Sequence, residues 1–241
     1  MAQKWHQKAT VQAALVTGMF LLVAAVVTGL FSYLVNDRDK ILIESGNTVV
    51  LDATPHPAQG PRKQNKIVFV TSEKRPANFG GLATADVICK NLARKAGYSG
   101  DFLAWLSDSN VGPSDRFKAS SVEYVLPSTK RVAASMESIL RCTSGMECLE
   151  HPINEHENGA PVEIPINFNS PEHRIWTATT SRGRPVGNSC HNWSEAVGTP
   201  SGANNTVVSL GDPRMTDLSW TQSYSVNCDT GLELAFYCFE Q

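Results

Sequence analysis

Hydrophobic and polar positions divide the chain into a long uncharged stretch, a proline-rich segment and a region of short alternating elements. No charged side chain occurs from position 9 to 36, and residues 13–35 are dominated by Ala, Val, Leu and Phe. A helix over this stretch is about 34 Å long, enough to cross a hydrocarbon core of roughly 30 Å. The run is too long for the core of a cleavable signal peptide, so it predicts an uncleaved signal anchor that crosses the membrane once.

The segment that follows has the composition of a linker. Residues 41–43 and 49–51 are apolar and could pair as a short hairpin, although two strands alone are marginally stable in water. Residues 54–66 then contain three prolines and no aromatic side chain. Because proline stiffens the chain and removes backbone donors, the pattern predicts a stalk that separates a folded domain from the membrane.

From residue 66 onward the pattern predicts a domain with both helices and strands. Runs rich in β-branched and aromatic residues predict strands at 66–71, 102–106, 122–126, 131–133, 175–178 and 233–240. Apolar residues at three- and four-residue spacing predict a helix that Thr84 caps, with Asp86 in its first turn and Gly97 after its end. A shorter helix is expected at 135–140. From residue 143 onward Gly, Pro, Asn and Ser dominate, which predicts a long loop region.

Cysteine use indicates the compartment. All six cysteines lie after position 88, an even number in a loop-rich region, which is typical of disulfide bonds in an oxidising compartment. Cys89 lies on the apolar face of the predicted helix, so its sulfur is available for an interior bridge. The positive charges on the two sides of the apolar stretch are nearly balanced and do not decide its orientation. The cysteines therefore favour a cytoplasmic amino terminus and a periplasmic or extracellular carboxy-terminal domain.

The expected organisation has four parts. They are a cytoplasmic tail at 1–12, a transmembrane helix at 13–35, a juxtamembrane stalk at 36–65 and an ectodomain at 66–241. Residues 67–241 carry a net charge of −5, which argues against a nucleic acid as partner. Small residues at positions 14, 18, 25 and 29 of the membrane helix would allow two helices to approach closely, so a homodimer through this helix is a further hypothesis.

Several motifs of the ectodomain together resemble a known family. They are GGLATADVIC at 80–89, AGYSGDFLAWLS at 96–107, IWT at 175–177, CHNW at 190–193, Cys228 and YCFE at 237–240. In this combination and order they resemble the endostatin branch of the C-type-lectin-like fold, and bacterial secreted and lipid-anchored proteins of unassigned function carry a similar domain. The resemblance covers roughly residues 66–241. It implies an α+β fold with a long loop region and disulfide bonds.

The resemblance also implies a disulfide pattern, whereas six cysteines alone allow 15 pairings. The implied pairs are Cys89 with Cys238, Cys190 with Cys228, and Cys142 with Cys148. Two family activities are not implied. The calcium-dependent sugar-binding lectins carry a Trp-Asn-Asp strand, and this chain reads Trp176-Thr177-Ala178 instead. The amino-terminal zinc histidines and the arginine-rich face of vertebrate endostatin are missing as well.

The candidate ligand-binding residues lie in the loop region. Asn154, Glu155, Glu157 and Asn158 form the densest group of oxygen ligands; Asn154, Glu155 and Glu157 are weak candidates for a calcium site, and a polar turn is the alternative. His151 and His156 are five residues apart, which does not fit the four-residue spacing of a helical zinc pair.

Two further features of the loop region are candidates for ligand contact. Arg182 and Arg184 could grip an anionic group, with an ordinary solvated turn as the alternative. Trp193 could contact a ligand or instead anchor a loop in the core.

No motif points to catalysis. The chain has no Gly-x-Ser-x-Gly sequence, and each cysteine has a bridging partner in the implied pattern. We therefore expect no enzyme activity and no cofactor, but a membrane-anchored binding or adhesion module that recognises a protein or a surface polysaccharide through its loop region. A structural subunit of a membrane assembly and a metal-dependent extracytoplasmic hydrolase are the alternatives.

Overall fold

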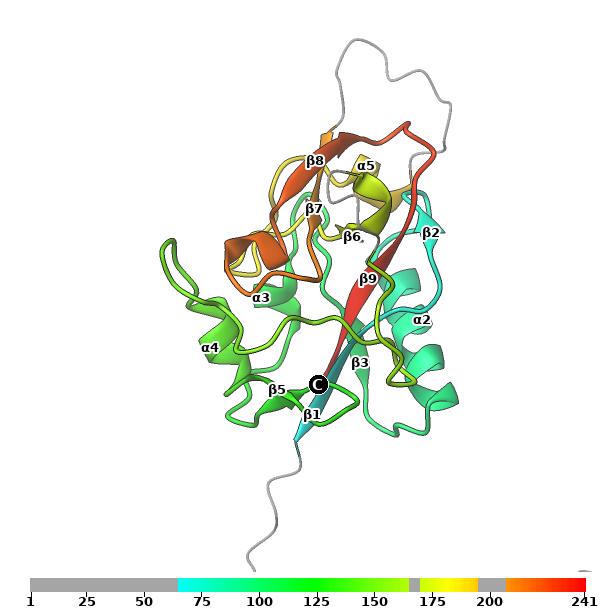
Figure 1. Cartoon of the computed structure of the whole chain (residues 1–241). Helices are drawn as coiled ribbons and strands as arrows, with labels where there is room; N and C mark the ends of the chain where they lie inside the picture. Colours follow the sequence, from blue (N-terminus) through cyan, green and yellow to red (C-terminus); the bar gives the residue numbers. More distant parts are fainter. Residues whose placement is uncertain (1–64, 165–169, 195–206) are drawn as a thin grey trace, which may run out of the picture. The chain divides into compact units, whose positions relative to one another are not determined.

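The computed structural model describes residues 65–164, 170–194 and 207–241. The predicted tail, the predicted membrane segment and the stalk up to residue 64 lie outside these ranges. Within them, no helix combines the length and the apolar character needed to cross a membrane. The described part folds as a mixed α+β domain with three disulfide bonds (Figure 1).

Short strands and short helices alternate along the domain. The strands are β1 (Lys66–Val70), β2 (Arg75–Pro76), β3 (Phe102–Ala104), β4 (Tyr124–Val125), β5 (Arg131–Ala133), β6 (Ile175–Trp176), β7 (Val207–Gly211), β8 (Tyr224–Asn227) and β9 (Glu233–Glu240). The helices are α2 (Leu82–Lys95), α3 (Pro113–Arg116), α4 (Met136–Leu140) and α5 (Cys190–Trp193), with 3-10 turns η1 (Pro171–His173) and η2 (Leu218–Trp220).

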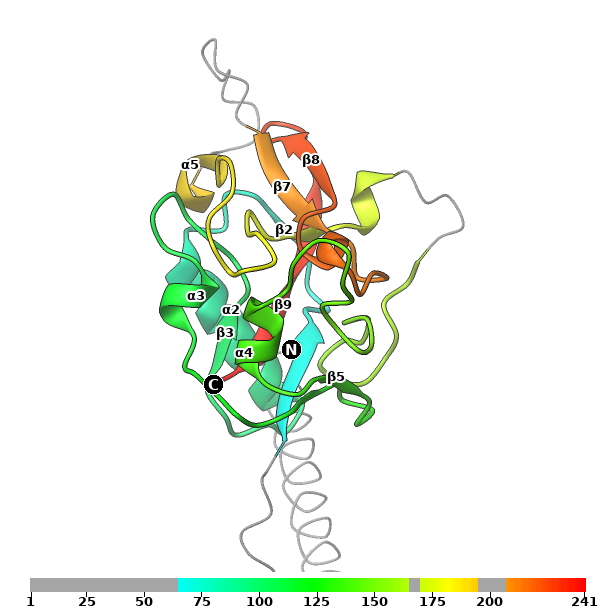
Figure 2. The ribbon, with the colours of Figure 1, turned by 90° about the vertical axis from the view of Figure 1, so that its left-hand side faces the viewer.

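The last strand, β9, is the centre of the sheet. The strand order is β5-β4-β1-β9-β6-β7-β8, and β2 and β3 also pair with β9. The carboxy-terminal half of β9 is antiparallel to β1 and β3, while its first half is parallel to β6 and antiparallel to β2. Figures 1 and 2 show β9 running through the middle of the domain with α2 beside it.

The sequence of β9 explains this central position. Its interior positions, from Leu234 to Phe239, are all buried. A strand that is apolar on both faces has to be covered on both faces, so it cannot lie at an open edge. Around Phe239 the rings of Trp105, Phe117 and Tyr124 lie with centroids 5.3 to 5.7 Å away, forming the aromatic core.

The helix α2 begins three residues earlier than the sequence predicted, and Thr84 does not cap it. The N-cap is Gly81, and the Thr84 hydroxyl donates to the Gly80 carbonyl at 3.1 Å. Gly80 and Gly81 have φ of 95° and 91°, a left-handed backbone that turns the chain directly into the helix.

Asp86 is consequently not in the first turn of α2, and it has a different role. Its carboxylate forms two 2.6 Å bonds with the Arg116 guanidinium and accepts the Ala104 N–H at 2.9 Å. The guanidinium also donates to the carbonyls of Ala104 and Leu106. Because Arg116 ends α3, this largely buried ion pair fixes α3 to α2 and β3.

The three disulfide bonds match the pattern that the family resemblance implied. Cys89 of α2 is bonded to Cys238 of β9, Cys190 to Cys228, and Cys142 to Cys148, and no described cysteine is free. The Cys89 sulfur is completely buried, as its position on the apolar helix face predicted. The Cys89–Cys238 bond joins the longest described helix to the central strand.

The secondary structure differs from the prediction mainly in extent. The strands expected at 102–106, 122–126 and 175–178 are shortened to two or three residues, whereas β5 and β9 have the expected bounds. The hairpin of β7 and β8 was not predicted at all. Tyr224, Ser225 and Asn227 of β8 are exposed, so this strand lacks the apolar run that identifies the others.

We predict that the disulfide bonds differ in their contribution to stability. Cys89 and Cys238 are 149 positions apart, whereas Cys142 and Cys148 are 6 apart. In the chain-entropy model the long closure stabilises the fold by about 5 kcal/mol and the short one by about 2 kcal/mol. Urea denaturation followed by tryptophan fluorescence should therefore show a much larger loss for Cys89→Ala/Cys238→Ala than for Cys142→Ala/Cys148→Ala. Equal losses would contradict this role of the long bridge.

Candidate functional site

Two of the predicted oxygen ligands, Glu155 and Glu157, form hydrogen bonds that hold their loop against neighbouring loops. The carboxylate of Glu155 accepts the N–H and the hydroxyl of Ser128 at 2.9 and 2.6 Å, and the carboxylate of Glu157 accepts the same two groups of Ser72. Both glutamates are buried, at 6% and 7% exposure. Their oxygens are bonded to two different loops, and in the described ranges no three His, Cys, Asp or Glu side chains are grouped so that they could hold a metal ion.

The two asparagines belong to the same loop. The Asn154 carbonyl accepts the Val162 N–H at 2.8 Å, and the Asn158 side chain accepts the Ala160 N–H at 2.9 Å. Beside them the Val70 N–H donates to the Glu155 carbonyl, which attaches the loop to the end of β1. Residues 154–158 thus form a polar turn bound to the sheet, which is the alternative that the sequence left open.

Trp193 lies in the core and presents no surface to a ligand. Its side chain is completely buried, and its indole N–H donates to the Ser107 carbonyl at 2.9 Å. The ring stacks on Phe79 with centroids 5.0 Å apart and meets Trp176 edge-on at 6.0 Å. Of the two interpretations of Trp193, the structure supports the loop anchor.

The turn that carries Trp193 has an unusual backbone. Four consecutive residues other than glycine, Cys190 to Trp193, have φ between 51° and 63°. This left-handed conformation costs roughly 1–2 kcal/mol per residue. The Cys190–Cys228 bond, the buried indole and the bond from the Ser109 N–H to the Asn192 side chain hold it in place. These contacts connect the loop region firmly to the core.

A cavity lies between α3 and α4. It has a volume of about 680 Å³, and we call it the α3–α4 hollow. Ten residues line it: Ser114, Phe117, Ala119, Ser120, Ser121, Ala134, Ser135, Met136, Glu137 and Leu140. The site has no signature in the sequence, because its residues come from two separate segments and carry no motif.

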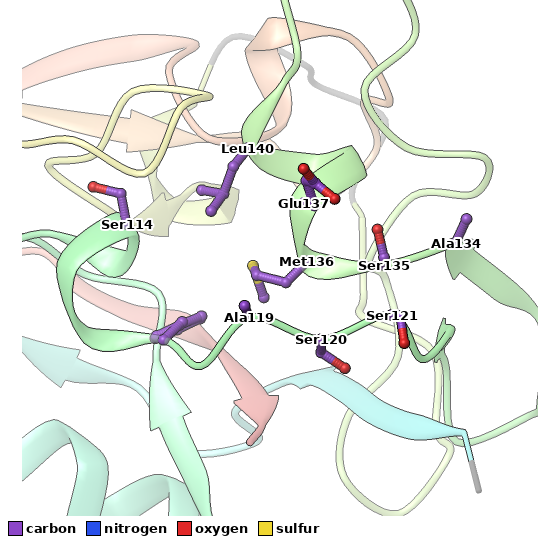
Figure 3. A pocket seen from close by; sticks show the side chains of 10 residues that line it. Ser114, Ala119, Ser120, Ser121, Ala134, Ser135, Met136, Glu137 and Leu140 are labelled. Carbon is purple, nitrogen blue, oxygen red and sulfur yellow. The ribbon is translucent and has the colours of Figure 1, made fainter. Parts of the chain in front are cut away.

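The hollow has an apolar centre and a hydroxyl margin. In Figure 3 the side chains of Leu140 and Met136 extend toward Ala119, while the serine hydroxyls lie around the margin. Met136 and Phe117 are buried and form the floor. The Ser114 hydroxyl is buried and has no hydrogen-bond partner within the described ranges. Such a combination of apolar surface and a few polar groups is typical of binding pockets.

The turn that carries the predicted arginine pair contacts the wall of this hollow. Residues 180–184, the arginine turn, are closed by bonds of 2.9 Å from the Thr180 N–H to the Arg184 carbonyl and from the Gly183 N–H to the Thr180 carbonyl. The Gly183 carbonyl accepts the Ser114 N–H at 2.9 Å. Since Ser114 lines the hollow, the turn is in direct contact with its wall.

Gly183 is required for this contact. Its φ is +70°, and a Cβ atom at this position would lie 2.6 Å from the Leu140 side chain and 2.8 Å from the Ser114 nitrogen. Arg182 and Arg184 on either side of it are exposed. The structure therefore places Gly183, the residue between the two predicted arginines, against two residues that line the hollow, and places residues 154–158 and Trp193 elsewhere.

Two other arginines of the loop region are engaged with a buried carboxylate. Asp212, at 1% exposure, accepts bonds from Arg174 and Arg214. Burial by itself raises the pKa of Asp212, but the bonds from Arg214 and the charge of Arg174 outweigh it, so the net pKa lies below the usual range. The arrangement fixes the end of β7 and differs from that of Arg182 and Arg184, for which no ion pair is found within the described ranges.

We predict that Gly183→Ala destabilises the domain more than Gly145→Ala. Both glycines have a positive φ, 70° and 83°, but nothing lies within 4 Å of a Cβ atom at Gly145. Each substitution carries the backbone cost of about 1–2 kcal/mol, and the one at Gly183 adds a steric cost of about 1–3 kcal/mol. Urea denaturation of both variants checks this difference. Equal losses would show that the arginine turn does not pack against Leu140 and Ser114.

Comparison with known proteins does not assign the chain to a family. No protein-family model matches it, and no curated protein matches it at a significant level. The geometry of the α3–α4 hollow and of the arginine turn is therefore the basis for assigning a function.

Proposed function

We propose that the chain is a membrane-anchored extracytoplasmic binding module with a C-type-lectin-like domain of the endostatin branch. The mixed α+β fold and the three disulfide pairs agree with that resemblance. Residues 13–35 serve as the single membrane anchor, with the amino terminus in the cytoplasm. Three disulfide bonds support this orientation, because they form and persist outside the reducing cytoplasm.

The observation that carries the binding function is the α3–α4 hollow with the arginine turn in contact with its wall. Its volume of about 680 Å³ is within the range of ligand sites, and its walls are held by the Asp86–Arg116 pair and by the contact of Gly183 with Ser114. A site on such a rigid frame binds a partner with little loss of conformational entropy. Among the described residues between Cys148 and Cys228, Gly183 of the arginine turn contacts two residues that line it.

The composition of the hollow favours binding over catalysis. Glu137 is the one ionisable residue among the ten that line it, and its carboxylate is paired with Arg141 at 2.6 Å. General acid–base and nucleophilic catalysis require a positioned donor or nucleophile with a partner that activates it. The serine hydroxyls have no histidine, lysine or second carboxylate beside them among these ten residues. A protein or a surface polysaccharide is the partner class.

A photo-crosslinking amino acid tests this function in the full-length chain in its native membrane. Placed at Ala134, an exposed residue of the hollow, it should form adducts with an extracytoplasmic macromolecule. The same amino acid at Val87, which is 55% exposed on α2, should not form them. Adding Ala119→Trp, which fills the hollow from an exposed position, should remove the adducts.

The matched control for that substitution is Ala83→Trp on an exposed position of α2, which should leave the adducts unchanged. Identical adducts from positions 134 and 87 would contradict the proposed site. Adducts that persist with Ala119→Trp would contradict it as well, because the hollow would then not be the contact surface.

A further inference from the structure

We propose that the α3–α4 hollow and the arginine turn bind one kind of partner, an acidic peptide segment that inserts an aliphatic side chain. This inference rests on the binding function proposed above and names the partner of the same site. It combines three properties of the described residues: the charge of the arginine turn, the chemistry of the centre of the hollow, and the position of the tryptophans.

The arginine turn, which contacts the wall of the hollow through Gly183, carries two positive charges. Arg182 and Arg184 are exposed, and no ion pair links either of them to a carboxylate within the described ranges. Gly183 between them is fixed by its bond to Ser114 and its packing against Leu140, so the backbone that carries the two arginines is held in place. Guanidinium groups bind carboxylates through two parallel hydrogen bonds, and the rigid turn limits the entropy lost on binding.

The ectodomain as a whole has the opposite charge. Residues 67–241 have a net charge of −5, so a diffuse positive field does not attract an acidic partner to this domain. Attraction of a carboxylate-rich segment is therefore local to the arginine turn. This local charge sets the position of the partner on the surface as well as its affinity.

The centre of the hollow fits an aliphatic side chain. The side chains of Leu140 and Met136 extend toward Ala119 there (Figure 3), and Phe117 also lines the hollow. Methionine adapts its shape to an inserted group, and alanine leaves room beside it. Burial of one leucine-sized side chain contributes about 1.5–3 kcal/mol. The volume of about 680 Å³ accommodates that side chain with the backbone on either side of it.

A peptide fits these features better than a polysaccharide. Sugar rings present flat apolar faces and need flat aromatic surfaces to cover them. The four tryptophans of the described ranges, Trp105, Trp176, Trp193 and Trp220, are all buried at 1% exposure or less. Phe117 in the floor of the hollow is 8% exposed. The hollow itself is lined by aliphatic side chains, by serines and by Glu137, which is paired with Arg141, and this lining suits an extended peptide.

Fluorescence anisotropy with the full-length chain in nanodiscs of neutral lipid tests this inference. The probe is a labelled nine-residue peptide with a central leucine between two blocks of four aspartates. It should bind, and replacing the leucine by serine should weaken binding at least about fivefold. Replacing the aspartates by lysines should remove binding. Raising the salt concentration should weaken the binding of the acidic peptide, because part of the site is exposed.

The substitution Arg182→Glu/Arg184→Glu should weaken binding of this peptide at least about tenfold. Arg94→Glu, at an exposed arginine of α2, is the matched control and should change binding less than about twofold. The side chains of Arg182 and Arg184 are exposed, so their substitution should not disturb the core. Near-ultraviolet circular dichroism of each variant verifies that the fold is retained. Ala119→Trp should also remove binding.

Three outcomes would overturn the inference. One is equal binding of the acidic and the basic peptide, and another is unchanged binding by the Arg182→Glu/Arg184→Glu variant. The third is preferential binding of polygalacturonate, a polysaccharide polyanion, over the acidic peptide. If adducts still form at Ala134, each of these three outcomes contradicts the acidic peptide as the partner but not the proposed binding function. Loss of the Ala134 crosslink itself rejects the proposed function.

Discussion

Strand β9 forms backbone hydrogen bonds with four other strands, and Cys238 within it is covalently joined to Cys89 of α2. Most of the domain therefore depends on the last residues of the chain. The strands β1, β3 and β6 all pair with β9, and they have no other common partner among the described strands. The disulfide bond fixes this arrangement, since it closes a loop of 149 positions in the unfolded chain.

The α3–α4 hollow is supported by this strand. Phe117 in its floor packs against Phe239 of β9 and against Trp105, with ring centroids 5.7 Å apart in both pairs. Arg116, the neighbouring residue, is bonded to Asp86 of α2. The other wall, at Leu140, contacts Gly183 of the arginine turn, which precedes the segment closed by the Cys190–Cys228 bond. Two independent parts of the frame thus meet at the hollow.

The sequence predicts the elements whose apolar pattern is uninterrupted, and these are the buried ones. Strand β9 and helix α2 are recognisable because burial imposes a continuous apolar run on one and a three- and four-residue spacing on the other. The strand β8 is exposed at three of its four positions and has no such pattern. The start of α2 was misplaced because Thr84 is a good cap by composition, whereas the two left-handed glycines before it set the boundary.

The candidate site was only partly predictable, for a related reason. Arg182 and Arg184 are recognisable by their charge, but the contact of Gly183 between them with Ser114 and Leu140 results from tertiary packing. Glu155 and Glu157 looked like metal ligands because a sequence shows oxygen atoms and does not show their partners. The backbone N–H and hydroxyl groups of Ser128 and Ser72 occupy those oxygens in the fold.

The account as a whole depends on a disulfide-closed domain outside the cytoplasm. The most direct test is alkylation of thiols in intact cells, followed by mass spectrometry of unreduced peptides of the full-length chain. We expect no alkylated cysteine and a cross-linked peptide that joins Cys89 to Cys238. Alkylated Cys89 and Cys238 in the native protein would contradict both the frame around β9 and the extracytoplasmic position of the binding site.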